Sequence, residues 1–195
     1  DPWAETPKIA AVLKQILAAA APDEAAYLVA EMNRNRIQSS DALDRIIALA
    51  AKDPKLAPDA VAQIAVSENI PAAGIPILIE AANDPNAKPA TLAQAITALA
   101  QTDSAPGASA MLNALVVLDQ VKGSGKEQDA GRSAFLSAPK LENIHQALEA
   151  EAAKVGTPTA AWAEAGLLAL AARTTGSPEA KEMSQKALEA GWADP

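Results

Sequence analysis

The sequence contains no cysteine, a single histidine and few aromatic side chains, which make up 3% of its 195 residues. Without cysteine there are no disulfides, zinc–thiolate sites, iron–sulfur clusters or thiol nucleophiles, although this absence does not fix the compartment. The chain has one histidine and no nucleophile-elbow motif, so it lacks the residues for a serine or cysteine catalytic triad of the usual kind. No apolar run reaches the roughly 18 to 20 residues that a membrane-spanning helix needs. We therefore expect a soluble, cytoplasmic or periplasmic protein that is not an enzyme and carries no cofactor.

Negative charge dominates the chain. It has 24 acidic and 16 basic residues, which give a formal net charge of −8. This balance repels the phosphates of nucleic acids and argues against a nucleic-acid ligand. An acidic surface can still attract a basic protein, so we expect a protein or peptide partner.

Alanine is the most frequent residue, with about 50 copies, and half of all residues are hydrophobic. Alanine is the strongest helix former, and its small side chain lets helix axes approach closely. The β-branched and aromatic residues that favour strands never alternate over a useful length. The sequence therefore predicts an all-α chain with a thin core, organised as a single helical domain over residues 1–195.

Prolines mark the expected helix starts, because proline is tolerated at the first helical position. The prolines that open an apolar run are Pro7, Pro22, Pro58, Pro71, Pro89, Pro139, Pro158 and Pro178. Thr6, Ser40, Thr157 and Ser177 are expected to cap helix starts. The expected helices cover about 7–20, 22–33, 40–52, 58–68, 71–83, 89–101, 107–122, 127–136, 139–155, 158–174 and 177–190. Their connections are short, so neighbouring helices should be antiparallel.

Apolar residues recur at helical spacing, and each set predicts one buried stripe. The clearest sets are Ile9, Val12, Leu13, Ile16 and Leu17, then Leu43, Ile46, Ile47 and Ala50, then Leu141, Ile144 and Leu148.

Two stretches that lie 31 residues apart repeat the same pattern. Asp53, Pro54, Pro58, Ala62 and Gln63 recur as Asp84, Pro85, Pro89, Ala93 and Gln94, and the preceding Ile46, Ile47, Ala50 and Ala51 match Ile77, Leu78, Ala81 and Ala82. A fixed period of this size indicates a stacked array, because one helix pair cannot bury its own apolar face.

The repeated stretch resembles a known family. Residues 75–80, followed by Asn83-Asp84-Pro85, are similar to the first helix and Asp-Pro turn of a HEAT repeat, and residues 91–100 are similar to its second helix. The resemblance is best over 40–101. It implies an α-α superhelix, a right-handed solenoid of antiparallel pairs with about 10 to 11 helices.

The C-terminal part resembles a different α-solenoid family. Trp162 and Gly166, with residues 185–190 closing the next helix, are similar to a tetratricopeptide unit. The chain ends on Asp194-Pro195, a dipeptide that elsewhere lies in a turn between helices. We therefore expect this array to be a fragment of a longer polypeptide.

Residues 122–133 break the rhythm of helices, and we expect a flexible insertion there, either a disordered loop or a binding loop. The segment includes Gly123-Ser124-Gly125-Lys126. A phosphate-binding loop needs four residues between its glycines, serine or threonine after the lysine, and a preceding strand. None of these conditions is met, so we do not expect nucleotide binding.

Glu142 and His145 have the Glu-x-x-His spacing of di-iron helical bundles, and Glu149 extends the same face. Such a site needs a second Glu-x-x-His helix, which a chain with one histidine cannot provide. The pattern is typical of a solvated face, and no metal site is predicted. His145 stays a candidate for a partner contact.

The segment Asn33-Arg34-Asn35-Arg36 is a small basic cluster in an acidic chain. Cations at a helix C-terminus interact favourably with its carbonyl groups, which is the structural interpretation. The alternative is a contact with an acidic partner through Arg34 and Arg36. Trp3, Trp162 and Trp192 are expected to pack in the core or between repeats.

Repetition without a catalytic constellation favours a non-catalytic helical-repeat scaffold. Its concave surface, lined by the second helix of each pair, would bind a protein, a peptide or another domain of the same polypeptide. The alternative is an accessory helical domain of a larger, exported bacterial enzyme, without catalytic residues of its own. A third hypothesis is a pigment-handling protein, since some HEAT-like proteins resemble bilin lyases, but the lack of cysteine disfavours it.

Overall fold

The computed structural model describes residues 7–154, 156–175 and 182, and this part of the chain contains helices and no β-strand. The helices are α1 (Pro7–Ala19), α2 (Pro22–Arg34), α3 (Ser40–Ala50), α4 (Ala57–Ala65), α5 (Ile75–Asn83), α6 (Pro89–Leu99), α7 (Ala105–Gln120), α8 (Gly125–Ser137), α9 (Glu142–Ala152) and α10 (Pro158–Thr175). Short 3-10 helices precede three of them: η1 (Pro54–Leu56), η2 (Ala72–Gly74) and η3 (Ala138–Lys140). The predicted all-α class is confirmed. The helix expected at 177–190 and the caps Thr6 and Ser177 lie outside the described residues.

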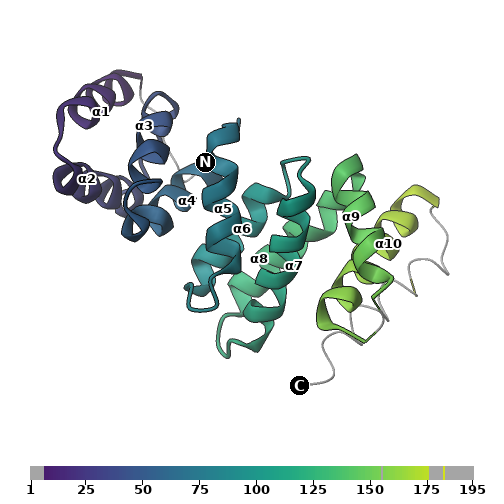
Figure 1. Ribbon diagram of the computed structural model, residues 1–195. Helices are drawn as coiled ribbons and strands as arrows, with labels where there is room; N and C mark the ends of the chain where they lie inside the picture. Colours follow the sequence, from purple (N-terminus) through teal and green to yellow (C-terminus); the bar gives the residue numbers. More distant parts are fainter. Residues whose placement is uncertain (1–6, 155, 176–181, 183–195) are drawn as a thin grey trace.

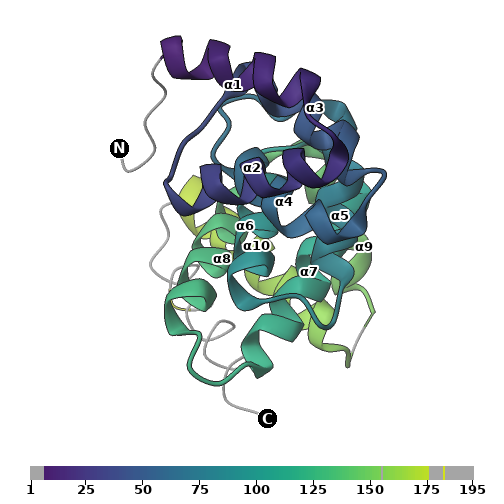
Figure 2. The same cartoon turned by 90° about the vertical axis from the view of Figure 1, so that its left-hand side faces the viewer.

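The helices are stacked in chain order and form two alternating layers (Figure 1). In one layer α1 contacts α3, α5 contacts α7 and α7 contacts α9. In the other, α2, α4, α6, α8 and α10 each contact the next. Neighbours such as α5 and α6 also pack across the layers. Seen from the N-terminal end, α1 and α2 lie nearest the viewer (Figure 2).

One apolar cluster runs through the stack, from Leu13 in α1 to Ala163 in α10. Many of its members are alanines, and its larger fully buried side chains include Leu78, Met111 and Phe135. Small side chains let the helices of both layers approach closely. The core therefore contains many small side chains, in agreement with the alanine-rich composition.

The turns before α4 and before α6 have the same hydrogen bonds. The carboxylate of Asp53 accepts from the backbone N–H of Lys55 at 3.0 Å, and that of Asp84 accepts from Asn86 at 2.9 Å. In each turn the aspartate carbonyl also accepts from the residue three positions on. The 31-residue sequence pattern is thus matched by local geometry at both turns.

Two of the predicted apolar stripes are largely buried, and one is only half covered. Ile46 and Ile47 in α3, and Ile144 and Leu148 in α9, are buried. In α1, Leu13 and Leu17 are buried, but Val12 is 52% exposed and Ile16 is 48% exposed. The prediction of one buried stripe in α1 was wrong for these two residues. The reason is position, because α1 packs on α3 and α2 and no helix precedes it in the described part of the chain.

The capping predictions have mixed outcomes. The hydroxyl of Thr157 accepts from the backbone N–H of Ala160 at 3.1 Å, which confirms the cap of α10. Ser40 is the first residue of α3 rather than its cap, and Ser39 precedes the helix in extended conformation. Ser39 therefore occupies the N-cap position, but its hydroxyl makes no capping hydrogen bond.

The segment expected to be a flexible insertion, 122–133, is mostly helical. Helix α7 ends at Gln120 and α8 begins at Gly125, so only residues 121–124 connect the two helices. The Nε2 of Gln128 donates to the carbonyl of Leu118 at 2.9 Å and to that of Val121 at 3.2 Å, which ties the first turn of α8 to the end of α7. A Cβ at Gly131 would lie 3.1 Å from the side chains of Ile96 and Leu118. Gly131 therefore allows the close approach of α8 to α6, which composition alone does not reveal.

Candidate functional site

The three residues predicted as partner contacts do not form one site. Arg34 lies in the last turn of α2, Arg36 follows that helix, and His145 lies on α9. Helices α2 and α9 stand near opposite ends of the stack (Figure 1). Arg34 pairs with Glu31 on its own helix, and its side chain is 70% exposed. The basic cluster thus sits at a helix C-terminus, as its structural interpretation requires.

Arg36 adopts a left-handed backbone conformation, with φ of 54°. The N–H of Ile37 donates to the carbonyl of Met32 at 2.8 Å, and the N–H of Arg36 donates to that of Asn33 at 3.1 Å. These two bonds form a Schellman motif, in which glycine is the usual residue at the left-handed position. Arginine pays a steric cost there because of its Cβ.

Replacing Arg36 by glycine is therefore expected to raise the free energy of unfolding by about 1 kcal/mol, because it relieves the left-handed conformation. Urea unfolding followed by circular dichroism measures the change. Asn35→Gly is the matched control: Asn35 has φ of −93°, so glycine there gains nothing and should destabilise α2. A stabilisation of equal size in both variants would contradict the argument.

His145 faces Glu149 across one turn of α9, with 3.5 Å between Nε2 and Oε1. Glu142 lies one turn earlier and its carboxylate accepts from Gln146. Across the described residues, no group of three histidine, cysteine or acidic side chains could hold a metal ion. Also within that part of the chain, no helix is long and apolar enough to cross a membrane.

A cavity of about 320 Å³ lies between the connector after α4 and the connector after α6. Its lining consists of residues 68–70, Ala72, Ile75 and residues 101–103, and we call it the edge pocket. Two acidic residues and two amides contribute to the lining, together with two isoleucines. Ile70 and Ile75 are half-buried, whereas the acidic residues are exposed.

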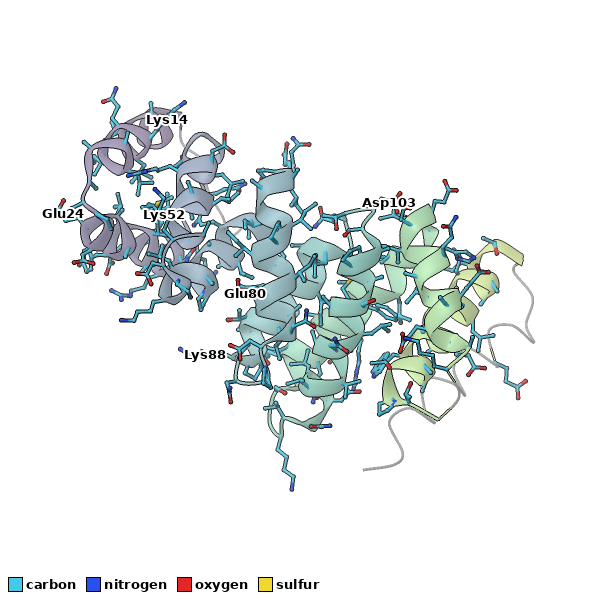
Figure 3. The ribbon with its side chains drawn as sticks, viewed as in Figure 1. Lys14, Glu24, Lys52, Glu80, Lys88 and Asp103 are labelled. Atoms are coloured by element: carbon cyan, nitrogen blue, oxygen red, sulfur yellow. The ribbon has the colours of Figure 1, made fainter. Side chains whose placement is uncertain are left out.

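Asp103 has a second role at this edge. Its Oδ1 accepts from the backbone N–H of Asn143 at 2.8 Å, and its Oδ2 accepts from the Asn143 side chain at 2.9 Å. Asn143 lies in the first turn of α9, so Asp103 caps that helix from the connector after α6. Figure 3 shows Asp103 at the upper edge of the stack. Both donors are neutral groups, so they hold the Asp103 carboxylate in position without neutralising its negative charge.

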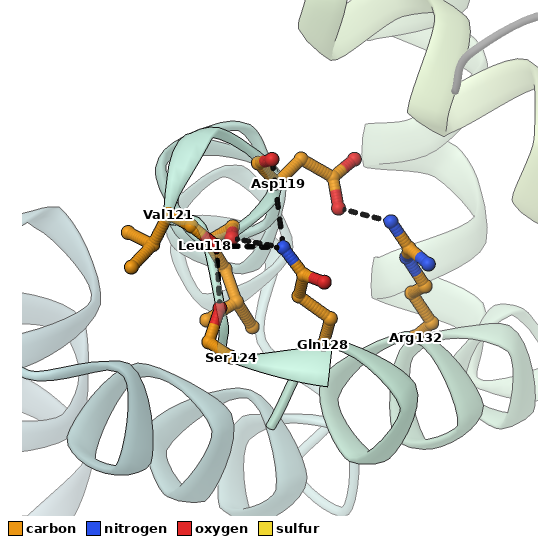
Figure 4. A network of polar contacts seen from close by, with 6 residues as sticks. All are labelled: Leu118, Asp119, Val121, Ser124, Gln128 and Arg132. Carbon is orange, nitrogen blue, oxygen red and sulfur yellow. Dashed lines mark hydrogen bonds and ion pairs between the residues drawn. The ribbon is translucent and has the colours of Figure 1, made fainter. Parts of the chain in front are cut away.

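A second polar cluster joins α7 and α8 (Figure 4), and Trp162 of α10 packs beside it. Asp119 in α7 forms an ion pair with Arg132 in α8 at 2.6 Å, and both side chains are about four-fifths buried, at 20% and 19% exposure. The guanidinium carbon of Arg132 lies 5.9 Å from the ring centroid of Trp162 in α10. Trp162 also packs edge-to-face on Phe135. This cluster confirms the predicted packing role of Trp162, while Trp3 and Trp192 lie outside the described residues.

Burial raises the pKa of the Asp119 carboxyl above its ordinary value of 3.8, although the Arg132 guanidinium and a hydrogen bond from Trp162 act in the opposite direction. The folded state therefore holds the proton more tightly than the unfolded state does. Between the unfolded and the folded pKa, the stability that this group contributes falls as the pH rises.

Asp119→Asn keeps the shape of the side chain and removes its titration. We expect the free energy of unfolding of D119N, relative to the unmodified protein, to increase as the pH rises from about 3 to about 7. Urea titrations at several pH values measure this difference. Asp129→Asn, an exposed position on α8, controls for the loss of one negative charge. A difference that stays flat or shrinks over this range would contradict the prediction.

Sequence reasoning did not single out Glu68, Asp103, Asp119 or Arg132. Asp119 and Arg132 are 13 residues apart, and Asp103 and Asn143 are 40 residues apart, so no helical spacing links either pair. For Asp119 the sequence contains one weaker indication than helical spacing would give. Asp119 directly follows the apolar run that ends in Leu118, where a charged side chain needs a partner if it is buried.

No protein-family model, no curated protein and no solved structure matches the chain. A function therefore has to be inferred from the residues and contacts described above.

Proposed function

We propose that this chain is a non-catalytic, HEAT-like helical-repeat scaffold that binds a protein or peptide, or another domain of the same polypeptide. The observation that carries the proposal is the 31-residue repeat, in which the turns at Asp53 and Asp84 share their hydrogen bonds. Stacked repeats present extended surfaces, and such surfaces are typical of binding proteins. The two alternating layers of helices support the same interpretation.

Helix α6 supports a partner surface on the even-numbered layer. It contacts α4, α5, α7 and α8, and most of its residues are buried. Apart from Pro89 at the first position of the helix, the residues left accessible are Ala90, Gln94, Thr97 and, just beyond the helix, Gln101. They recur at intervals of three or four residues, so they form one stripe on the face that no neighbouring helix covers. This stripe is uncharged, which suits a peptide backbone or polar side chains.

Site-specific photo-crosslinking tests the proposal in cells that produce the natural protein. A photoreactive amino acid at Ala90 probes the α6 stripe, and one at Ser109 probes the exposed side of α7 in the other layer. Both positions carry small exposed side chains, so neither substitution should disturb the fold. We expect a defined protein adduct from position 90 and none from position 109. Absence of an adduct at both positions, or adducts at position 109 alone, would refute partner binding by the even-numbered layer.

A further inference from the structure

We propose that the edge pocket holds a lysine or arginine side chain of a basic peptide segment in the partner. This inference rests on the proposed function and adds to it the surface and the chemistry of the contact. It comes from the residues of the lining, which combine two carboxylates with two isoleucines and an alanine.

The charges of the edge pocket all have one sign. Glu68 and Asp103 line it, and its lining contains no lysine, arginine or histidine. Neither carboxylate takes part in an ion pair within the described chain. The two acidic residues are 35 positions apart and reach the cavity from separate connectors. An anion or a phosphate would therefore be repelled here, and a cation attracted.

The apolar part of the lining suits the stem of a long basic side chain. Ile70 and Ile75 are half-buried and contribute to the cavity wall beside Ala72. Lysine and arginine bury their methylene stems along apolar surface while the charged head stays near water and acceptors. A small cation without a stem would leave these isoleucines uncovered, and a purely apolar group would leave the carboxylates without a partner.

Hydrogen-bond acceptors are available around the charged head. Nε2 of Gln101 donates to the carbonyl of Thr97 at 3.2 Å, so the amide is held by its nitrogen and its oxygen remains an acceptor. The contacts from Asn143 hold the Asp103 carboxylate in place without neutralising it. The site also adjoins the α6 stripe, because Gln101 belongs to both. A peptide bound along α6 could therefore place one basic side chain in the edge pocket.

Nuclear magnetic resonance titration of the whole chain tests this inference, with N-acetyl-arginine amide as the probe and N-acetyl-glutamine amide as the uncharged comparison. Binding at low salt should shift the backbone signals of residues 68–70 and 101–103, and the glutamine derivative should leave them unchanged. Glu68→Gln should weaken binding of the arginine derivative about threefold, the size expected for losing one exposed charge. Glu80→Gln makes the same change of net charge on α5, away from the pocket (Figure 3), and should have no effect.

Three results would overturn the inference: no shifts at the pocket, equal shifts with both derivatives, or equal weakening by E68Q and E80Q. The last result would mean that the arginine derivative senses overall charge only. Such a failure is separate from that of the proposed function. If crosslinking at position 90 still yields an adduct, the scaffold stands and its partner avoids the pocket; if that adduct is absent as well, both proposals fall.

Discussion

Replacing Phe135 by alanine is expected to lower the free energy of unfolding by about 3 to 5 kcal/mol. Phe135 is the only phenylalanine of the chain, and its side chain is fully buried in α8. Its ring stands perpendicular to that of Trp162 in α10, with 6.1 Å between the centroids. Alanine occupies many of the core positions, and a packed core relaxes only in part around a deleted ring. The cavity therefore persists and its full cost is felt.

Denaturant unfolding, followed by the helical circular dichroism band near 222 nm, measures the loss of stability. Tyr27→Ala is the matched control, because it also removes an aromatic ring from a helix, but Tyr27 is 69% exposed. We expect that control to change stability by less than about 0.5 kcal/mol. A loss below about 1 kcal/mol for F135A would mean that the α8 and α10 junction contributes little to folding.

The local features of this chain were predictable because they depend on near neighbours in sequence. Pro22, Pro89 and Pro158 each open a helix, as their fixed backbone angle favours. The repeated Asp-Pro turns form the same short-range hydrogen bonds at both copies. The all-α class follows from the same local preferences, since the excess of alanine favours helix at nearly every position.

Features that depend on the stack were not predictable from one sequence. The stripe of α1 has the spacing of a buried face, yet Val12 and Ile16 are exposed, because spacing does not say that a helix stands at the end of an array. The glycines near 125 suggest a loop, yet Gly131 serves the packing of α8 on α6. In the first case no helix covers the two residues, and in the second the neighbouring helix α6 is distant in sequence, so neither outcome follows from local spacing.

The candidate site shows the same limit. Arg34 and Arg36 stand out as a basic cluster and His145 by its Glu-x-x-His spacing, and the structure places the two arginines far from the histidine. The edge pocket joins residues 68–70 with residues 101–103, which only the stacking of α4 on α6 brings together. Its negative charge agrees with the acidic balance of the whole chain, so the basic partner that composition suggests and the occupant proposed for the pocket have the same sign of charge, whereas composition does not indicate this place.

Gln63→Ala is expected to lower the free energy of unfolding by about 1 to 3 kcal/mol. Gln63 is 1% exposed, and its Nε2 donates to Oδ1 of Asn33 at 2.8 Å and to the carbonyl of Ile37 at 2.9 Å. Asn33 in turn donates to the backbone and carboxylate oxygens of Asp59, both at 2.9 Å. Alanine would leave two acceptors at the end of α2 without their donor, and an acceptor left unpaired in a buried place is costly.

The repeat itself supplies the control. Gln94 occupies the position of Gln63 one period later, but it is half-buried on the accessible stripe of α6, and no tie to an earlier helix was found for it in the described part of the chain. Gln94→Ala should therefore change stability by less than about 0.5 kcal/mol. Hydrogen exchange should also show α2 opening first in Q63A, because that variant loses two of the hydrogen bonds that tie the end of α2 to α4, although those from Asn33 to Asp59 remain. Equal losses in Q63A and Q94A would mean that the shared apolar packing of the repeat, and not the polar tie to α2, sets the effect of this glutamine. A larger loss in Q63A than in Q94A would show that Gln63 holds α2 in place. Its counterpart Gln94, one period later, would then be free of that structural role on the proposed binding surface.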